Sequence, residues 1–287
     1  MKILLNGVLY ESTEAVVSVF DHGFLYGMGL FETFRTYNGE PFLLVEHLER
    51  LANGCRELQI GVTWSQEEIR NQVRILLEAN HLDDAYFRLS ISAGEDILGL
   101  PTGSYLKPNV VLYIKPLPKR DETIYQQGKP LQQLTLSRNT PEGSHRLKSF
   151  HYMNNILAKR EMATYPWAAQ AEGIFTNKDG LLAEGVVSNL FWVKDEVLRT
   201  PAIDTGILPG ITRHYVLQIA RSIGLDVEEG HWHWSQLEHA EEVFITNSIQ
   251  EIVPANGFFD KKGQFTSFGR PFEVGFVTGK LMSNYRP

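Results

Sequence analysis

The stretch LLAEGVVSNLFWVKDEVLRTP, residues 181–201, has apolar and β-branched runs separated by polar turns, which predicts two or three consecutive β-strands. A helical pattern follows at 211–224 (ITRHYVLQIARSIG), and Gly224 is expected to end that helix. The run at 241–255 (EEVFITNSIQEIVPA) is typical of a strand with an exit loop. This succession of strands and helices predicts an α/β or α+β fold.

The same alternation extends towards the N-terminus. A helix is expected where apolar residues recur at steps of four and three, namely Leu44, Leu48, Leu51, Cys55 and Leu58. A second helix is expected over 66–80, with four inward residues, Ile69, Val73, Leu76 and Leu77. Aromatic and β-branched residues predict strands at 85–92 and 109–114. The α/β pattern therefore covers the whole chain.

Three prolines and a run of mixed charge distinguish residues 115–130 (KPLPKRDETIYQQGKP) from the apolar segments on either side. We therefore expect two domains, a smaller α/β domain at 1–117 and a larger one at 129–287, with a linker at 118–128. A strand is expected at 131–137. Residues 147–163, in the larger domain, are expected to form the end of a strand followed by a helix.

Composition narrows the class of protein. Of the 287 residues, 43% are hydrophobic and 21% are charged, which is typical of a globular protein. The formal net charge of −7 disfavours a nucleic-acid partner, because such binding relies on Lys and Arg. Cys55 is the single cysteine, so no intrachain disulfide is expected, and this favours the cytoplasm. No apolar run approaches the ~20 residues that a membrane helix needs.

Two segments have functional and ordinary interpretations that their own residues leave open. In LPGITR (208–213), backbone N–H groups at a helix start and the Thr212 hydroxyl suit a phosphate, or Thr212 only caps its helix. Lys148, flanked by Leu147 and Phe150, is either a desolvated reactive amine or a solvated surface group.

Other polar residues leave similar alternatives. Glu184 lies between apolar runs, where a carboxylate needs a partner, or it belongs to an exposed turn. Arg50 lies beside the apolar stripe of its helix, where its guanidinium suits a phosphate, or it is a surface residue. His231 and His233 have no further ligands in an evident pattern, so no metal is expected. The glycines of 22–35 do not match a dinucleotide or phosphate-loop motif.

Six segments resemble, in order, the fold-type IV enzymes that use pyridoxal 5'-phosphate (PLP). This family holds branched-chain aminotransferases, D-amino-acid aminotransferases and 4-amino-4-deoxychorismate lyases. The six are DHGFLYGMGLFETFR (21–35), EHLERL (46–51), LKSFHYMNN (147–155), AEGVVSNLFWV (183–193), LPGITR (208–213) and EEVFITNSIQEIVP (241–254). The resemblance implies a D-amino-acid-aminotransferase-like fold of two α/β domains with PLP bound between them, in a homodimer.

The resemblance also implies a role for each matching residue. Lys148 would link covalently to the cofactor and move protons, and Glu184 would pair with the pyridine nitrogen. The phosphate cradle would consist of four residues, Arg50, Ile211, Thr212 and Ser248. Tyr152 would lie near the phenolic oxygen of the cofactor. Substrate contacts are expected from Tyr26, Phe31, Arg88 and Asn247.

Within the family, three features favour a lyase. Thr33 stands in FETFR where branched-chain enzymes have glycine, and such a threonine would handle a proton in catalysis. Asn247 stands where those aminotransferases also have glycine, and the Arg-x-His carboxylate trap of D-amino-acid enzymes is missing from RLSISAG. One departure is Leu98 in GEDILGL, where some lyases carry arginine; Arg88 is the alternative source of that charge.

The activity implied is conversion of 4-amino-4-deoxychorismate to 4-aminobenzoate and pyruvate, a step towards folate. The substrate would come from a separate synthase. The first alternative is a branched-chain or D-amino-acid aminotransferase of the same fold. A remote alternative is a non-catalytic PLP-binding protein.

Overall fold

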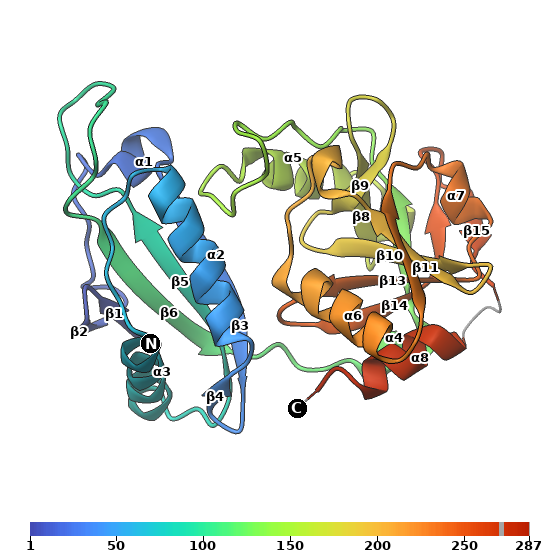
Figure 1. Ribbon diagram of the computed structural model, residues 1–287, viewed down its shortest axis with the longest axis horizontal. Helices are drawn as coiled ribbons and strands as arrows, with labels where there is room; N and C mark the ends of the chain where they lie inside the picture. Colours follow the sequence, from blue (N-terminus) through green and yellow to red (C-terminus); the bar gives the residue numbers. More distant parts are fainter. Residues whose placement is uncertain (270–272, 287) are drawn as a thin grey trace. The chain divides into compact units, whose positions relative to one another are not determined.

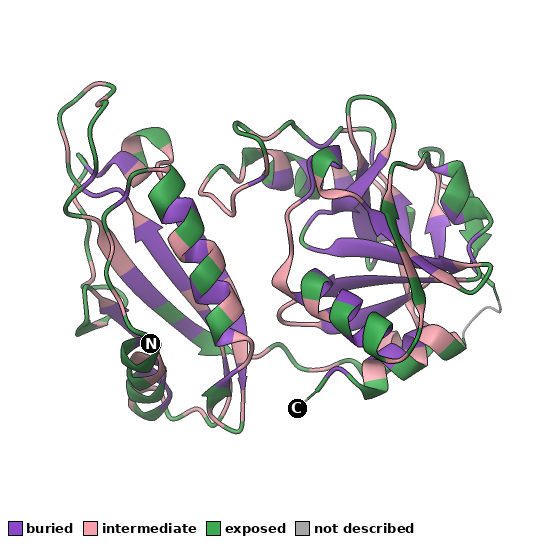
Figure 2. Cartoon of the chain, in the orientation of Figure 1, coloured by how far each residue is buried: buried purple, intermediate pink, exposed green. Residues whose placement is uncertain are grey.

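The computed structural model describes residues 1–269 and 273–286. The chain forms two compact units, each a mixture of helices and sheet (Figure 1). Unit 1 comprises Met1–Lys119 and Leu147–His151, and unit 2 comprises Arg120–Arg146 and Tyr152–Pro287. The central strands of both units are largely buried, as the purple segments of Figure 2 show, whereas Val8–Glu11 and Asp226–Gly230 at the sheet edges are mostly exposed. The expected α/β class is confirmed.

Unit 1 is a six-stranded sheet in the order β2-β1-β6-β5-β3-β4 with two long helices. Its elements are β1 (Lys2–Leu5), β2 (Val8–Glu11), α1 (His22–Tyr26), β3 (Gly29–Tyr37), β4 (Glu40–Pro41), α2 (Leu44–Glu57), α3 (Gln66–Ala79), β5 (Ala85–Ser92) and β6 (Asn109–Pro116). Neighbouring strands pair antiparallel throughout. Helix α2 lies along the sheet in Figure 1.

The two long helices of unit 1 follow from their apolar spacing. The expected inward residues of α3 are all buried, and in α2 the stripe from Leu44 to Cys55 is buried while Leu58 follows the helix end. Ser65 caps α3 by accepting a hydrogen bond from the backbone N–H of Glu68, whose carboxylate accepts from the Ser65 N–H. The apolar faces and the cap together fix where these helices start and what they cover.

The lysine segment differs from expectation. Residues 147–151, which we expect from the sequence to lie in the C-terminal domain, belong instead to unit 1. The reason is strand pairing, because Ser149 forms an antiparallel bridge with Leu30 of β3. The expected linker at 118–128 also contains a short helix, α4 (Glu122–Gln127), capped by Asp121.

Unit 2 contains a nine-stranded mixed sheet in the order β12-β11-β10-β13-β14-β7-β8-β9, with β15 paired to β14. Its strands are β7 (Lys129–Gln133), β8 (Glu172–Thr176), β9 (Leu182–Gly185), β10 (Asn189–Lys194), β11 (Val197–Pro201), β12 (Asp226–Gly230), β13 (Glu242–Asn247), β14 (Glu251–Phe259) and β15 (Phe265–Ser267). Its helices are α4, α5 (Met153–Met162), α6 (Ile211–Ser222), α7 (Ser235–Glu238) and α8 (Phe276–Ser283), with 3-10 turns at Pro166–Ala168 and Ile203–Thr205.

The strands expected over 181–201 are confirmed as β9, β10 and β11. The exit loop expected after 247 is instead a tight turn into β14, so 241–255 forms an antiparallel hairpin. Glu251 starts β14 with a φ of 66°, a left-handed conformation that the apolar pattern does not reveal. The strand expected at 131–137 is shorter, since β7 ends at Gln133.

No helix within 1–269 and 273–286 is both long and apolar enough to cross a membrane.

Candidate active site

Backbone hydrogen bonds hold Lys148 at the edge of the unit 1 sheet. The Phe31 N–H donates to the Lys148 carbonyl at 2.9 Å, and the Phe150 N–H donates to the Gly29 carbonyl at 3.0 Å. Gly29 is required here because a Cβ at this position would lie 2.3 Å from the Phe150 ring. The lysine therefore extends from a segment that is hydrogen-bonded to β3.

The surroundings of Lys148 lower the pKa of its amine. The side chain is half-buried, and its Nζ lies 4.6 Å from the centre of the Phe31 ring. Burial, with Arg50 and Arg88 nearby, lowers the pKa of Lys148 to about 8, although the Glu32 carboxylate opposes this shift. A larger share of the amine is therefore neutral near pH 7 than in an ordinary lysine.

Arg88 lies on the same sheet face as Phe31, with its guanidinium carbon 3.5 Å from the ring centre. Its Nε donates to the Ser90 hydroxyl at 3.0 Å. Thr33 pairs with Arg88 across the two strands, so both side chains lie on one face of the sheet. An open groove of about 440 Å³ is lined by Arg88, Ser90, Ser92, Val111, Tyr113 and Phe150.

Arg50 lies on α2 and forms a two-bond ion pair with Glu32 of β3. Its Nε and Nη2 donate to the two oxygens of Glu32 at 2.7 and 2.6 Å. Unit 1 thus brings together a reactive amine, two arginines and an aromatic ring.

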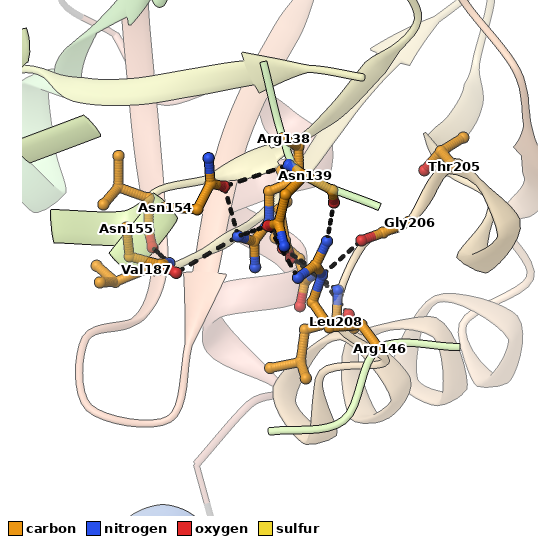
Figure 3. A network of polar contacts seen from close by, with 12 residues as sticks. Arg138, Asn139, Arg146, Asn154, Asn155, Val187, Thr205, Gly206 and Leu208 are labelled. Atoms are coloured by element: carbon orange, nitrogen blue, oxygen red, sulfur yellow. Dashed lines mark hydrogen bonds and ion pairs between the residues drawn. The ribbon is translucent and has the colours of Figure 1, made fainter. Parts of the chain in front are cut away.

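In unit 2, Glu184 on β9 is buried among cationic and polar donors. Figure 3 shows Arg138 and Arg146, the two cationic residues of this network, beside Asn139. The Arg138 Nε donates to Glu184 Oε1 at 2.8 Å, and the Arg146 Nε lies 3.9 Å from the same oxygen. The Leu208 backbone N–H donates to Oε2 at 2.9 Å, and Asn189 donates to it at 3.4 Å. Two guanidinium groups, one backbone N–H and one side-chain amide therefore surround the Glu184 carboxylate.

The two arginines do not depend on Glu184 alone. Arg138 Nη1 also donates to the Asn154 side chain at 2.8 Å, and Arg146 Nε donates to the Gly206 carbonyl at 2.6 Å. Burial lowers the pKa of Arg146 to about 10, since Arg138 adds to the effect and Glu184 opposes it. Arg146 therefore remains charged at neutral pH, and two guanidinium groups face one carboxylate in this buried group.

The start of α6 offers donors for an anion. The helix begins at Ile211 after Gly210, and no side chain of the described residues caps its first turn. The buried Thr212 hydroxyl donates to the Ser248 hydroxyl at 3.4 Å. Backbone N–H groups of a first helical turn, with two hydroxyls, are a suitable cradle for a phosphate. Leu208, which donates to Glu184, lies three residues before this helix, so one loop connects the carboxylate with the helix start.

The remaining expected residues have mainly local contacts. Asn247 accepts from the N–H groups of Ile249 and Gln250, at 3.0 and 2.8 Å, and so shapes the turn that carries Ser248. The Tyr26 hydroxyl accepts from the Gly99 N–H at 3.1 Å. Tyr152 precedes α5 and contributes to the electrostatic environment of Arg146.

On α2, His47 Nδ1 also donates to Glu32 Oε2 at 2.6 Å. Four polar residues of these groups escape the sequence patterns, namely Glu32, His47, Arg138 and Arg146. Glu32 shares one face of β3 with Leu30 and Phe34, which are two residues before and after it, and this spacing signals a carboxylate on a buried face. His47 and Arg50 are three residues apart on α2 and therefore share a helix face. Arg138 and Arg146 lie in an irregular segment, where no periodicity indicates burial.

Taken by themselves, the fold and these two groups define a mixed α/β protein with a reactive lysine, a buried carboxylate and a helix start suited to a phosphate. The model of the class IV amino-transferase family matches residues 29–258, and the chain belongs to this family. The expected family resemblance is therefore confirmed.

Three known proteins show how the chain relates to this family. The aminodeoxychorismate lyase of Bacillus subtilis (strain 168) is 46% identical over 254 residues, covering 88% of this chain and 85% of the relative. The 4-amino-4-deoxychorismate lyase structure from Pseudomonas aeruginosa has a TM-score of 0.84 and 29% identity, covering 98% of this chain and 97% of its own. The branched-chain amino acid aminotransferase structure from Escherichia coli has a TM-score of 0.84 and 27% identity, covering 98% of this chain and 92% of its own.

Proposed function

We propose that the chain is a PLP-dependent lyase that converts 4-amino-4-deoxychorismate to 4-aminobenzoate and pyruvate, a step of folate biosynthesis. The observation that carries this proposal is the Lys148 amine, half-buried, with its pKa lowered to about 8 beside Arg88. Similarity to two lyases along most of the chain supports this reaction.

The residues present fit PLP by the chemistry of their donors. The cofactor needs an amine, an anion site and a partner for its ring nitrogen. We propose Lys148 as the amine and Glu184 as the ring-nitrogen partner. The phosphate would be held by Arg50, Ile211, Thr212 and Ser248, with Tyr152 near the phenolic oxygen. When bound, PLP supplies an electron-withdrawing ring that stabilises negative charge at the amine-bearing carbon.

The reaction is removal of one proton followed by loss of pyruvate. Neutral Lys148 removes the proton from the amine-bearing carbon of the substrate. The bond between the ring and the enolpyruvyl oxygen then breaks as the ring becomes aromatic. The Thr33 hydroxyl or a water delivers a proton to the departing fragment, which leaves as pyruvate. Arg138 donates to Glu184 at 2.8 Å and so holds this carboxylate in place.

Substrate binding is proposed at the sheet face of unit 1. Arg88 supplies the positive charge for a substrate carboxylate, beside the groove lined by Ser90 and Tyr113. Phe31 supports the guanidinium through a cation–π contact. Tyr26 and Asn247 are proposed as further contacts of the substrate. Their polar groups also form hydrogen bonds within the protein.

The lowered pKa of Lys148 predicts a pH dependence for cofactor attachment. The neutral amine attacks the aldehyde, so with a pKa of about 8 its active fraction rises from about a tenth at pH 7 to about nine-tenths at pH 9. Stopped-flow absorbance of the apoprotein mixed with PLP should therefore show a rate that rises with pH and levels off above about 9. A rate still climbing at about pH 10 would indicate an ordinary lysine.

Thr33 is expected to matter more for elimination than for amino-group transfer. Thr33→Gly removes the hydroxyl, and we expect lyase turnover to fall about a hundredfold, because one proton-transfer group is lost. Any transaminase side activity should fall much less. Thr33→Ser keeps the hydroxyl and should recover most of the lyase rate. Equal loss of both activities in Thr33→Gly would remove Thr33 from the lyase mechanism.

Product identification tests the reaction itself. The purified protein is supplied with 4-amino-4-deoxychorismate made by a synthase and removed from it, with no keto acid present. The proposal expects 4-aminobenzoate and pyruvate in equal amounts, seen by chromatography. The second candidate is a branched-chain or D-amino-acid aminotransferase, and the similarity to the Escherichia coli branched-chain enzyme supports its branched-chain form. Transfer of an amino group to 2-oxoglutarate with no aromatic product would establish that candidate.

Assembly as a homodimer is part of the proposal and has support within unit 1. Large apolar side chains are exposed there, among them Phe24 (71%), Leu98 (73%) and Leu100 (83%). The loop that carries Leu98 is tied to α1 by hydrogen bonds of His22 and Tyr26. Such a patch favours a protein partner, and a second copy is proposed. Sedimentation as a monomer at assay concentrations would contradict it.

Cytoplasmic location and supply of the substrate by a separate synthase complete the proposal. The single cysteine, Cys55, is buried and free, which suits a reducing compartment.

A further inference from the structure

A buried polar trio connects β3 with α2 in unit 1. Glu32 is 1% exposed and His47 is 2% exposed, so both are inside the core. His47 Nδ1 donates to Glu32 Oε2 at 2.6 Å, and Arg50 donates Nη2 to the same oxygen at 2.6 Å and Nε to the other at 2.7 Å. Both oxygens of the Glu32 carboxylate therefore accept a short hydrogen bond from the Arg50 guanidinium, and Oε2 also accepts one from the His47 ring.

The protonation states of the trio are set by burial and by mutual charge. Burial would raise the pKa of Glu32, but Arg50 and His47 outweigh it and lower the pKa to about 2. Burial lowers the pKa of His47 in spite of the neighbouring carboxylate. At neutral pH the trio is therefore one carboxylate, one guanidinium and one neutral imidazole, and the net charge is zero.

Stability alone is a poor explanation for this arrangement. Helix α2 already packs on the sheet through buried Leu44, Leu48 and Leu51. Apolar residues of similar volume generally stabilise a core as well as, or better than, a buried ion pair. A two-bond arginine–carboxylate pair does something that apolar packing cannot do, because it fixes the plane and direction of the guanidinium.

We propose that Glu32 and His47 are positioning residues that hold the Arg50 guanidinium in the orientation needed to bind the cofactor phosphate. This inference rests on the proposed function, which assigns Arg50 to the phosphate cradle. Glu32 sets the direction of the guanidinium through two hydrogen bonds. His47 holds the carboxylate from a second side, so that Glu32 cannot rotate with Arg50.

Comparing PLP with pyridoxal, which lacks the phosphate, tests this role. Dissociation constants of both aldehydes are measured by absorbance titration of the apoprotein, and their ratio reports the contribution of the phosphate. In Glu32→Gln we expect the PLP preference to fall roughly ten- to hundredfold, the range seen when a residue that orients a ligating group is removed. Both aldehydes use Lys148, so any effect of Glu32 on that amine cancels in the ratio.

Reference variants make the result specific. Arg50→Ala should lose the same preference as Glu32→Gln. Glu40→Gln removes an exposed carboxylate that pairs with Arg70 and Arg74 in the same unit, and it should leave the preference unchanged. His47→Leu should reduce the preference, whereas His47→Asn, which keeps an N–H donor, should restore part of it. The two histidine variants keep the test available if Glu32→Gln fails to fold.

The outcomes separate this inference from the proposed function. If wild type binds PLP and pyridoxal equally, Arg50 is not part of a phosphate cradle and the assignment behind the inference fails. If wild type prefers PLP and Arg50→Ala loses the preference while Glu32→Gln and His47→Leu keep it, the trio is only structural. The proposed function would then stand, and the positioning role would be wrong.

Discussion

Replacing Lys148 by alanine is expected to abolish covalent attachment of PLP and to reduce turnover by about three orders of magnitude or more. The amine is both the attachment point and the proposed base, and general-base catalysis alone contributes roughly 10²–10⁴-fold. The variant should still bind PLP noncovalently, because the proposed phosphate cradle and Glu184 are unchanged. Turnover of the lyase substrate and the visible spectrum of the protein measure both effects.

Lys129 provides a matched control. It is a second half-buried lysine whose pKa is lowered by burial, and it lies on β7 of unit 2. Lys129→Ala should keep both the spectrum and the turnover of wild type. Normal turnover in Lys148→Ala would remove this residue from the mechanism, since a half-buried amine of lowered pKa would then have no catalytic role.

Replacing Glu184 by glutamine is expected to slow turnover by about a hundredfold while PLP affinity changes much less. Glutamine keeps the size of the side chain but loses the negative charge that favours a protonated ring nitrogen. It would also leave Arg138, which donates to Glu184 at 2.8 Å, without its ionised acceptor. Because Asn154 also accepts from Arg138, the local structure should persist. Steady-state kinetics and PLP titration separate the two effects.

The Glu172→Gln variant is a control that separates the loss of a buried carboxylate from the loss of a catalytic one. This carboxylate is 3% exposed and accepts from the Val187 N–H and the Ser188 hydroxyl, both at 3.0 Å. Glu172→Gln should lower thermal stability but leave the turnover of folded protein near that of wild type. If Glu184→Gln behaves in the same way, its carboxylate is structural and does not serve the ring nitrogen.

Much of the fold follows from local patterns. The α2 and α3 stripes and the strands at 85–92 and 181–201 are readable from the sequence, because one buried face repeats with a fixed period. Residues 147–151 are different, since their place depends on pairing with β3 more than a hundred residues away. The turn that leads into β14 depends on the left-handed conformation of Glu251, which the apolar pattern of 241–255 does not predict.

Only some of the candidate residues can be identified from the sequence. Lys148, Glu184 and Thr212 stand out through family resemblance, because their own surroundings in sequence allow ordinary interpretations. Glu32, which holds Arg50, lies inside the matching segment 21–35 but gains no role from the resemblance, and Arg138, which holds Glu184, lies outside all six segments. Their partners are 18 and 46 residues away in sequence, and contacts of that kind emerge only when strands and helices pack.

Reduction of the PLP-loaded protein with borohydride, followed by peptide mapping, tests the central claim most directly. Borohydride makes a lysine–PLP link permanent, so mass spectrometry can locate the modified residue. The label is expected on the peptide that contains Lys148, in a ratio of about one per chain. A label on any other lysine, or an unlabelled Lys148 in protein with bound PLP, would contradict the assignment of this amine as the cofactor anchor.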